Sequence, residues 1–185
     1  KDHVTEEDKK LLLIERSATG IDVFDNKEEY NQEVLEFLDF ENPEHDPKNR
    51  FDTTFAYSGK YSIKVDTDQL YSPMISKKYH EITDDYYAWI RASVKVFPTS
   101  EESADNIYLA VSFHYQGKGH KWRTARSDRL EEPLKVNEWN TLTLDYLTPE
   151  MRSKNEELRV FVWNPNKVEF YMDDFKVEAF ERRNR

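Results

Sequence analysis

The sequence predicts an all-β protein, an antiparallel β-sandwich with a less regular N-terminal segment. Three observations support this prediction. Short stretches of alternating apolar and polar residues recur along the chain, separated by turn residues such as Pro, Gly, Asn and Ser. Aromatic residues, which favour strands, make up 14% of the 185 residues. No long helical period follows residue 40.

The N-terminal forty residues are the least regular part of the sequence. The apolar run Leu11–Ile14 needs to be buried, and Asp25 could cap a short helix over Asn26–Gln32. Residues Val34–Phe40 then alternate as a strand with a possible bulge. A helix over Lys27–Asp39 is the alternative interpretation of the same residues.

The remaining strands are predicted from alternation in which one set of side chains is apolar. In the second of them, for example, Ala92, Val94 and Val96 share one face. The predicted strands are Tyr61–Val65, Tyr87–Phe97, Asn106–Tyr115, Thr141–Tyr146, Leu158–Trp163 and Val168–Met172.

The length of the chain suits a single domain. We expect an N-terminal extension over residues 1–33, a sandwich over residues 34–180 and a short tail over residues 181–185. The chain begins at Lys1 rather than Met. We therefore expect a processed part of a longer protein, from which a signal peptide or membrane anchor has been removed.

Composition excludes several classes of function. A net charge of -10 and a pI near 5.1 argue against a nucleic-acid partner, because phosphate binding needs a dense basic surface. The absence of cysteine excludes disulfides, thiolate nucleophiles and thiolate zinc sites. No apolar run reaches the length of a membrane span.

The sequence also lacks the usual signatures of a hydrolase. A glycosidase needs two carboxylates that face one cleft, but 37 acidic residues make chance pairs inevitable. Neither a Gly-x-Ser-x-Gly elbow nor a His-Glu-x-x-His motif occurs. The sequence therefore predicts a protein without catalytic activity of its own, which leaves open a role as the accessory domain of an enzyme.

Large aromatic residues alternate with Arg and His on the faces opposite the apolar ones. A pyranose has a C–H face that stacks on aromatic rings and hydroxyls that bind polar side chains, so this mixture suits a sugar. An additional layer over this face, such as the segment around Leu11–Ile14, is the alternative. The candidate residues are Trp89, Arg91, Tyr108, His114, Phe161 and Trp163.

A second candidate site is the loop Tyr115–Arg123, which contains His120 and Trp122 between two predicted strands. Loops at a sandwich edge often bind ligands. The alternative is a hairpin in which Trp122 folds back on the sheet. We expect Trp139, which follows a turn, to be structural.

Three short segments that are far apart in the sequence are informative in the order in which they occur: Leu38–Asn42, Tyr57–Val65 and Val168–Val177. Together they resemble the jelly-roll β-sandwich modules of the galactose-binding-like superfamily, which includes many non-catalytic carbohydrate-binding modules. The resemblance covers roughly Val34–Phe180. It implies a jelly roll whose first and last strands are joined.

In similar modules a calcium ion lies between these two strands. The resemblance places its ligands at Glu41, at the carbonyls around Ser58 to Lys60, and at Asp173 or Asp174. Ca²⁺ prefers several oxygen ligands of this kind. The alternative is that the two aspartates cap a turn and pair with basic side chains.

These expectations combine into one functional prediction. The chain is expected to bind a glycan or polysaccharide on an aromatic-lined sheet face or at edge loops. We expect it to be bacterial and extracytoplasmic, in the periplasm or at the cell surface, and linked to other domains of a longer chain. The alternative is an ectodomain of a larger bacterial surface or membrane protein that docks proteins and has no sugar ligand.

Overall fold

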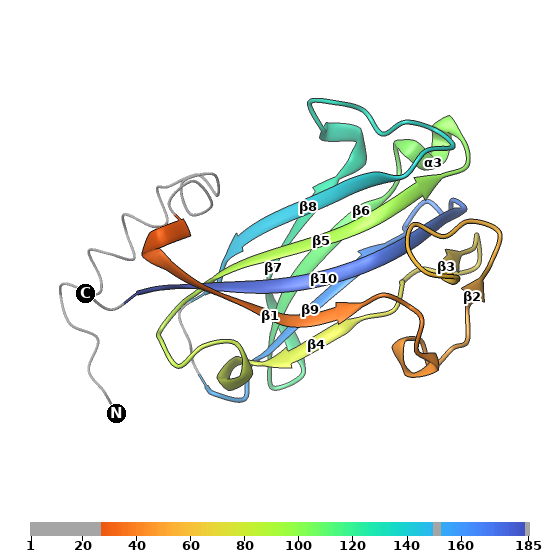
Figure 1. Cartoon of the computed structure of the whole chain (residues 1–185). Helices are drawn as coiled ribbons and strands as arrows, with labels where there is room; N and C mark the ends of the chain where they lie inside the picture. The colour runs from red at the N-terminus through yellow and green to blue at the C-terminus, as the bar shows by residue number, and fades with distance from the viewer. Residues whose placement is uncertain (1–26, 150–152, 184–185) are drawn as a thin grey trace.

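The computed structural model describes residues 27–149 and 153–183, which form two antiparallel sheets packed face to face (Figure 1). One sheet has the strand order β2-β3-β10-β5-β8, with β1 also paired to β10; the other has the order β4-β9-β6-β7. The strands are β1 (Tyr30–Leu38), β2 (Phe51–Asp52), β3 (Ser62–Val65), β4 (Ile75–Lys78), β5 (Trp89–Pro98), β6 (Tyr108–Tyr115), β7 (Lys118–Arg126), β8 (Asn140–Leu147), β9 (Glu157–Trp163) and β10 (Phe170–Arg182).

Helices are short in the described residues. They are η1 (Lys27–Glu29), η2 (Pro43–His45), η3 (Tyr79–Glu81), α3 (Glu101–Ala104) and η4 (Ser127–Arg129). None of the helices in this part of the chain is long and apolar enough to cross a membrane.

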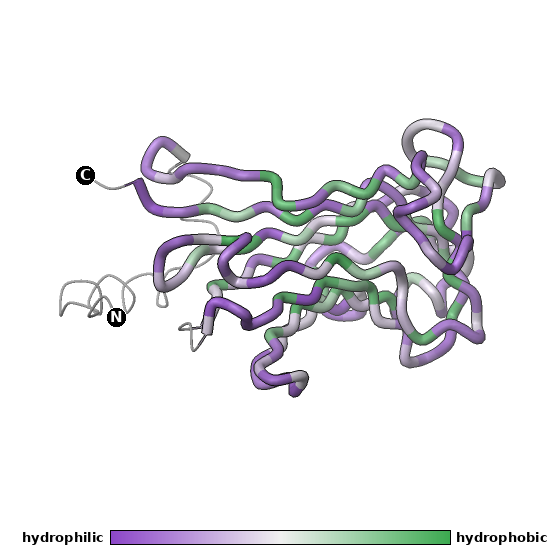
Figure 2. Tube along the Cα trace, turned by 90° about the horizontal axis from the view of Figure 1, so that it is seen from below, coloured by the Kyte–Doolittle hydropathy of each residue, from purple (hydrophilic) through white to green (hydrophobic). Residues whose placement is uncertain are grey.

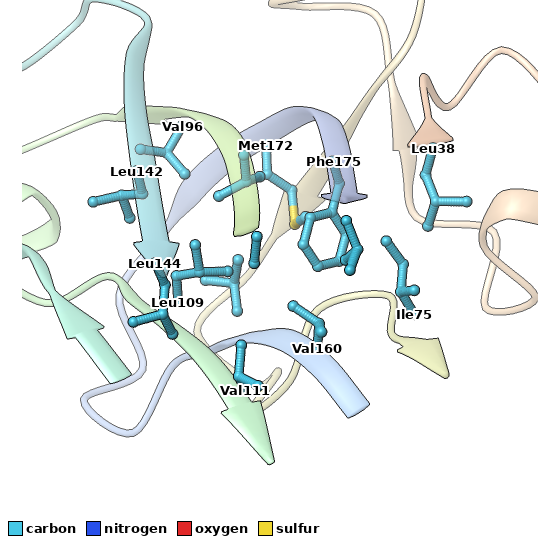
Figure 3. Packing of buried hydrophobic residues seen from close by; sticks show 14 of the residues in the cluster. Leu38, Ile75, Val96, Leu109, Val111, Leu142, Leu144, Val160, Met172 and Phe175 are labelled. Carbon is cyan, nitrogen blue, oxygen red and sulfur yellow. The ribbon is translucent and has the colours of Figure 1, made fainter. Parts of the chain in front are cut away.

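The core lies between the two sheets and consists of the predicted apolar faces. Figure 3 shows side chains such as Val96 and Met172 from one sheet and Val160 from the other directed into the same layer. In Figure 2 hydrophobic residues lie along the strands, and hydrophilic residues dominate the loops. The alternation therefore predicted the buried faces of these strands correctly.

The last strand, β10, is much longer than predicted. Its buried residues are Phe170 and Met172 before the aspartates, then Phe175 and Val177 after them, so the inward phase shifts by one residue. A bulge against β5 causes this shift. The predicted strand ended at Met172 because the bulge breaks the alternation.

The first strand confirms the β interpretation of the N-terminal region, and the alternative helix over Lys27–Asp39 is wrong. Strand β1 pairs with β10 from Tyr30 to Leu38 with a bulge at Leu35, and the described residues before it, from Lys27, form the single turn η1. Paired residues therefore extend past both expected limits of the sandwich, residues 34 and 180.

Two strands of the smaller sheet were missed. Only Ile75 is buried in β4, and no residue of β7 is; both strands lie at the edges of this sheet. Neither segment therefore has the apolar alternation that predicts a strand, and β7 was interpreted largely as a loop. The predicted features Leu11–Ile14 and the cap Asp25 lie outside the described residues. The helix predicted over Asn26–Gln32 is wrong from Tyr30 on, because β1 begins there and only the turn η1 comes before it within the described part of the chain.

A pair of phenylalanine substitutions tests the core. Phe175 is fully buried between the sheets, whereas Phe37 on β1 is 44% exposed. We expect Phe175→Ala to lower the free energy of unfolding by about 3–5 kcal/mol, because it leaves a cavity. Phe37→Ala should cost less than about 1 kcal/mol. Equal losses in denaturant titrations would contradict this description of the core.

Candidate ligand-binding groove

A groove of about 610 Å³ lies on the outer face of the four-stranded sheet. Strands β6, β7 and β9 supply most of it, and the segment that leads into β4 supplies the rest. Its lining residues are Tyr71, Met74, Ala110, Ser112, His114, Gly119, His120, Lys121, Trp122, Arg159, Phe161 and Trp163.

The sequence of β6 explains the hollow. On its outer face, Ala110 and Ser112 are only 2% and 8% exposed and form a floor of small side chains. Cross-strand neighbours are large: Ala110 pairs with Phe161 on β9, and Ser112 pairs with Trp122 on β7 and Arg159 on β9. Small residues between large ones leave a groove along the middle of the face.

Aromatic side chains form the walls. The rings of Trp122 and Trp163 meet edge to face, with centroids 6.0 Å apart, and those of Tyr71 and Phe161 do so at 5.4 Å. Trp122 is 64% exposed, so most of its indole is available to a ligand. Tyr108 is buried behind Trp163, with ring centroids 5.9 Å apart, and supports that wall.

Polar groups lie between these rings. Ser112 Oγ and His114 Nε2 are 2.9 Å apart and hydrogen-bond to each other. Burial, and then the charge of Arg159, hold the pKa of His114 below its ordinary value. His120 Nε2 lies 3.0 Å from Oε1 of the buried Glu156, close enough for an ion pair although not aligned as a hydrogen bond.

Arg159 is held in place by Glu157. Its Nε and Nη2 donate to the two oxygens of that carboxylate at 3.0 and 3.3 Å. The Ser76 hydroxyl and the Lys78 ammonium also donate to the carboxylate of Glu157. These hydrogen bonds, that from Arg159 foremost, lower the pKa of Glu157 to about 2. The carboxylate therefore stays charged and orients Arg159.

The structure brings most of the predicted sugar-binding residues together. The sheet-face candidates His114, Phe161 and Trp163 and the loop candidates His120 and Trp122 line the same groove. The predicted loop is in fact the hairpin of β6 and β7, with His120 at the point where the pairing register shifts. The sheet-face site and the loop site that the sequence suggested separately therefore belong to one groove.

Two predicted residues lie elsewhere. Trp89 and Arg91 belong to β5, in the opposite sheet, and do not share a face with the groove. Trp89 is buried against Tyr30 and Phe180, and Arg91 forms an ion pair with Asp145 at 2.7 Å. Alternation correctly showed that these side chains point away from the core, but it does not show which sheet a strand joins.

Seven lining residues were not among the candidates, and four of them have large side chains. Tyr71 and Met74 precede β4, where no strand was predicted, so nothing in the sequence placed them near the groove. Lys121 and Arg159 lie beside predicted residues, and the outward position of Arg159 on its strand was the one available signal. Trp139 packs against Phe97 and Tyr57 at the six-stranded sheet, which fits the expected structural role.

The residues expected to hold calcium also lie close together. Oδ2 of Asp173 accepts the backbone N–H groups of Tyr57 and Ser58 at 2.8 and 3.1 Å, and Asp174 accepts the Ser58 hydroxyl at 2.7 Å. Oε1 of Glu41 accepts the N–H groups of Lys60 and Tyr61, both at 2.8 Å.

Gly59 permits this close approach. It has a φ of 58°, and a Cβ at this position would clash with the carboxylate of Glu41. The conformation explains why a glycine occurs in the Tyr57–Val65 segment of the sequence.

In this arrangement the carboxylates do not fit a calcium site. Their oxygens accept hydrogen bonds from N–H and O–H groups, and burial raises the pKa of Asp173 to about 6. No group of three or more His, Asp or Glu side chains in residues 27–149 and 153–183 is placed to hold a metal ion. The calcium ion itself stays a prediction.

Removal of metal ions by a chelator distinguishes a calcium site from a cluster of carboxylates held by hydrogen bonds alone. Because N–H groups already satisfy the carboxylates, we expect EDTA to leave the melting temperature unchanged, as nothing that binds the folded state is removed. Scanning calorimetry with EDTA and with added CaCl₂ measures this. A melting temperature that falls in EDTA and recovers with Ca²⁺ would instead establish the predicted ion.

The pKa of Glu157 predicts a pH dependence. A carboxyl whose pKa is lowered on folding adds stability above its unfolded pKa, and this stability is lost as the pH falls through the folded value. We therefore expect Glu157→Gln to be less stable than the wild type at pH 6, and the difference to shrink between pH 4.5 and about 2. Glu138→Gln, at an exposed position, is the control and should follow the wild type. A difference that does not vary with pH would contradict the ion pair.

Solved structures share this architecture. The CBM22-1 xylan-binding domain of Paenibacillus barcinonensis Xyn10C matches with a TM-score of 0.54 and 13% identity, over 82% of this chain and 97% of that domain. The CBM22-2 xylan-binding domain of the same protein matches with a TM-score of 0.50 and 13% identity, over 78% of this chain and 99% of that domain. The tandem of both domains matches with a TM-score of 0.53 and 16% identity, over 80% of this chain and 50% of the tandem.

No protein-family model and no curated protein sequence matches the chain. At these identities the solved structures establish the fold alone. The chain has the jelly-roll β-sandwich fold that its three sequence segments predict.

Proposed function

We propose that the chain is a non-catalytic carbohydrate-binding module, and that a glycan binds in the groove on the outer face of the four-stranded sheet. The observation that carries the proposal is the groove itself: exposed aromatic walls on either side of hydrogen-bonding groups, on the fold of xylan-binding domains.

The chemistry of the lining suits a sugar ring. Trp122, Phe161 and Trp163 offer ring surfaces for the C–H face of a pyranose, and Ser112 and Arg159 lie between them to meet its hydroxyls. The volume falls within the range of roughly 300–1,000 Å³ that is usual for ligand sites. Several sugar units bound at modest affinity fit an open groove of this kind, because much of the hydrogen-bond energy replaces bonds to water.

Binding without hydrolysis is supported by the composition of the lining. Glycoside hydrolysis uses two carboxyl groups on either side of the scissile bond, about 5–10 Å apart. None of the described residues that line the groove is Asp or Glu.

We further propose that the module is bacterial and extracytoplasmic, and that it works as part of a longer chain. In the Paenibacillus tandem two such domains follow one another in one protein, which gives a precedent for linkage to other domains. Linked modules bind a polymer more tightly than either does alone, through their effective concentration.

A second function, protein docking, is favoured by one feature of the opposite sheet. Phe55 and Tyr57 are 37% and 46% exposed, and they lie on a cluster with Phe97, Trp139 and Tyr171. Exposed aromatic clusters are common at protein interfaces. In this cluster the rings pack mainly on one another, and so the groove is the stronger candidate site.

Substitution of a groove tryptophan tests the proposed function. We expect Trp122→Ala to weaken binding to a polysaccharide about tenfold, because one aromatic contact of roughly 1 kcal/mol or more is lost. Affinity electrophoresis with soluble plant and bacterial polysaccharides measures the change. The high exposure of Trp122 makes a folding defect unexpected, and the melting temperature checks this.

Tyr57→Ala is the matched control, an exposed aromatic residue on the opposite sheet. It should bind as the wild type does. Loss of binding in Tyr57→Ala with full binding in Trp122→Ala would move the site to the other sheet. Absence of binding to every polysaccharide by folded wild-type protein would favour the protein-docking function.

A further inference from the structure

The charge of the groove is opposite to that of the whole chain. The chain carries a net charge of -10, yet the charged residues that line the groove are Lys121 and Arg159, of which Arg159 shares the outer face with Ser112. No acidic side chain of the described residues lines it.

Acidic and basic residues are also distributed unequally between the strands of the two sheets. The four-stranded sheet contains a single acidic residue, Glu157. Its basic residues are Lys77, Lys78, Lys118, Lys121, Arg123, Arg126 and Arg159. The strands of the six-stranded sheet carry more acidic than basic residues.

Two acidic residues lie next to the groove. The buried Glu156 is 3.0 Å from His120, and the carboxylate of Glu157 is shared between Arg159 and Lys78, so that two cations face this one anion. Both hydrogen bonds of Arg159 within residues 27–149 and 153–183 use Nε and Nη2, which leaves Nη1 for a ligand.

We propose that the groove selects an acidic glycan, one that carries carboxylate groups on uronic acid residues. This inference rests on the proposed function and names the class of sugar. The C–H faces of the chain stack on Trp122, Phe161 and Trp163, while a carboxylate of the same chain meets Arg159 beside the floor. A guanidinium that is already held by Glu157 is oriented before the ligand arrives, which favours recognition of a planar carboxylate.

The net negative charge of the chain does not oppose this assignment. Charges more than about 10 Å apart are largely screened at 0.1 M salt, so distant carboxylates repel the glycan weakly. Arg159 in the groove contacts it directly. Acidic residues elsewhere on the surface would also discourage binding of polyanions away from the groove.

The test compares each acidic polysaccharide with the same polymer after chemical reduction of its carboxyl groups to alcohols. The pairs are polygalacturonate and glucuronoxylan, each native and reduced, measured by affinity electrophoresis or calorimetry. We expect at least one native polymer to bind about tenfold more tightly than its reduced form, and the preference to weaken as NaCl is raised from about 0.05 to 0.5 M.

Variants locate the selectivity. Arg159→Gln should reduce binding of the native polymer several-fold and leave binding of the reduced form nearly unchanged. Lys135→Gln, an exposed position before β8 in the other sheet, removes the same charge and should behave as the wild type. Melting temperatures confirm that each variant is folded.

The outcomes separate this inference from the proposed function. Equal binding of native and reduced polymers overturns the selection of acidic glycans and retains a carbohydrate-binding module. Binding of poly-glutamate as tightly as of the native polysaccharides also overturns it, because charge alone would then suffice. Absence of binding to all four polymers and to the wider polysaccharide panel overturns the proposed function itself.

Discussion

The whole sandwich depends on how β10 is paired. This strand pairs with β5 along one edge and with β3 and then β1 along the other, so it joins the two ends of the chain within one sheet. Where β3 gives way to β1, the ladder is interrupted at Asp173 and Asp174. The carboxylate of Asp173 accepts the N–H groups of Tyr57 and Ser58 there, so these buried donors are satisfied where no strand can satisfy them.

The pairing of β10 with β5, β3 and β1 determines which surface of the sandwich is free for a ligand. With β10 and its neighbours on one side of the core, the smaller sheet keeps its outer face open, and the small residues of β6 make a groove in it. The sheets also separate charge, since the acidic residues of strands lie mostly in one and the basic residues in the other. The groove therefore combines aromatic surface with local positive charge on an acidic protein.

Much of the fold was predictable because strand alternation is a local property. Residues such as Ala92 and Val96 are inward simply because neighbouring side chains alternate, and the prediction of their burial is confirmed. The same reasoning failed at bulges and edges. The bulge at Asp173 shifted the phase of β10, and the edge strand β7 has no buried residue to set an alternating pattern.

The sequence by itself determined the fold class, the inward faces of most strands and the outward position of the aromatic and basic residues. Only the tertiary structure decided which of those residues meet. Trp89 and Trp163 both point outward from their strands, yet Trp89 is buried on the outer face of the six-stranded sheet and Trp163 lines the groove of the opposite sheet. The reason is physical: the side-chain period is set within a strand, whereas sheet membership is set by pairing between segments far apart in the chain.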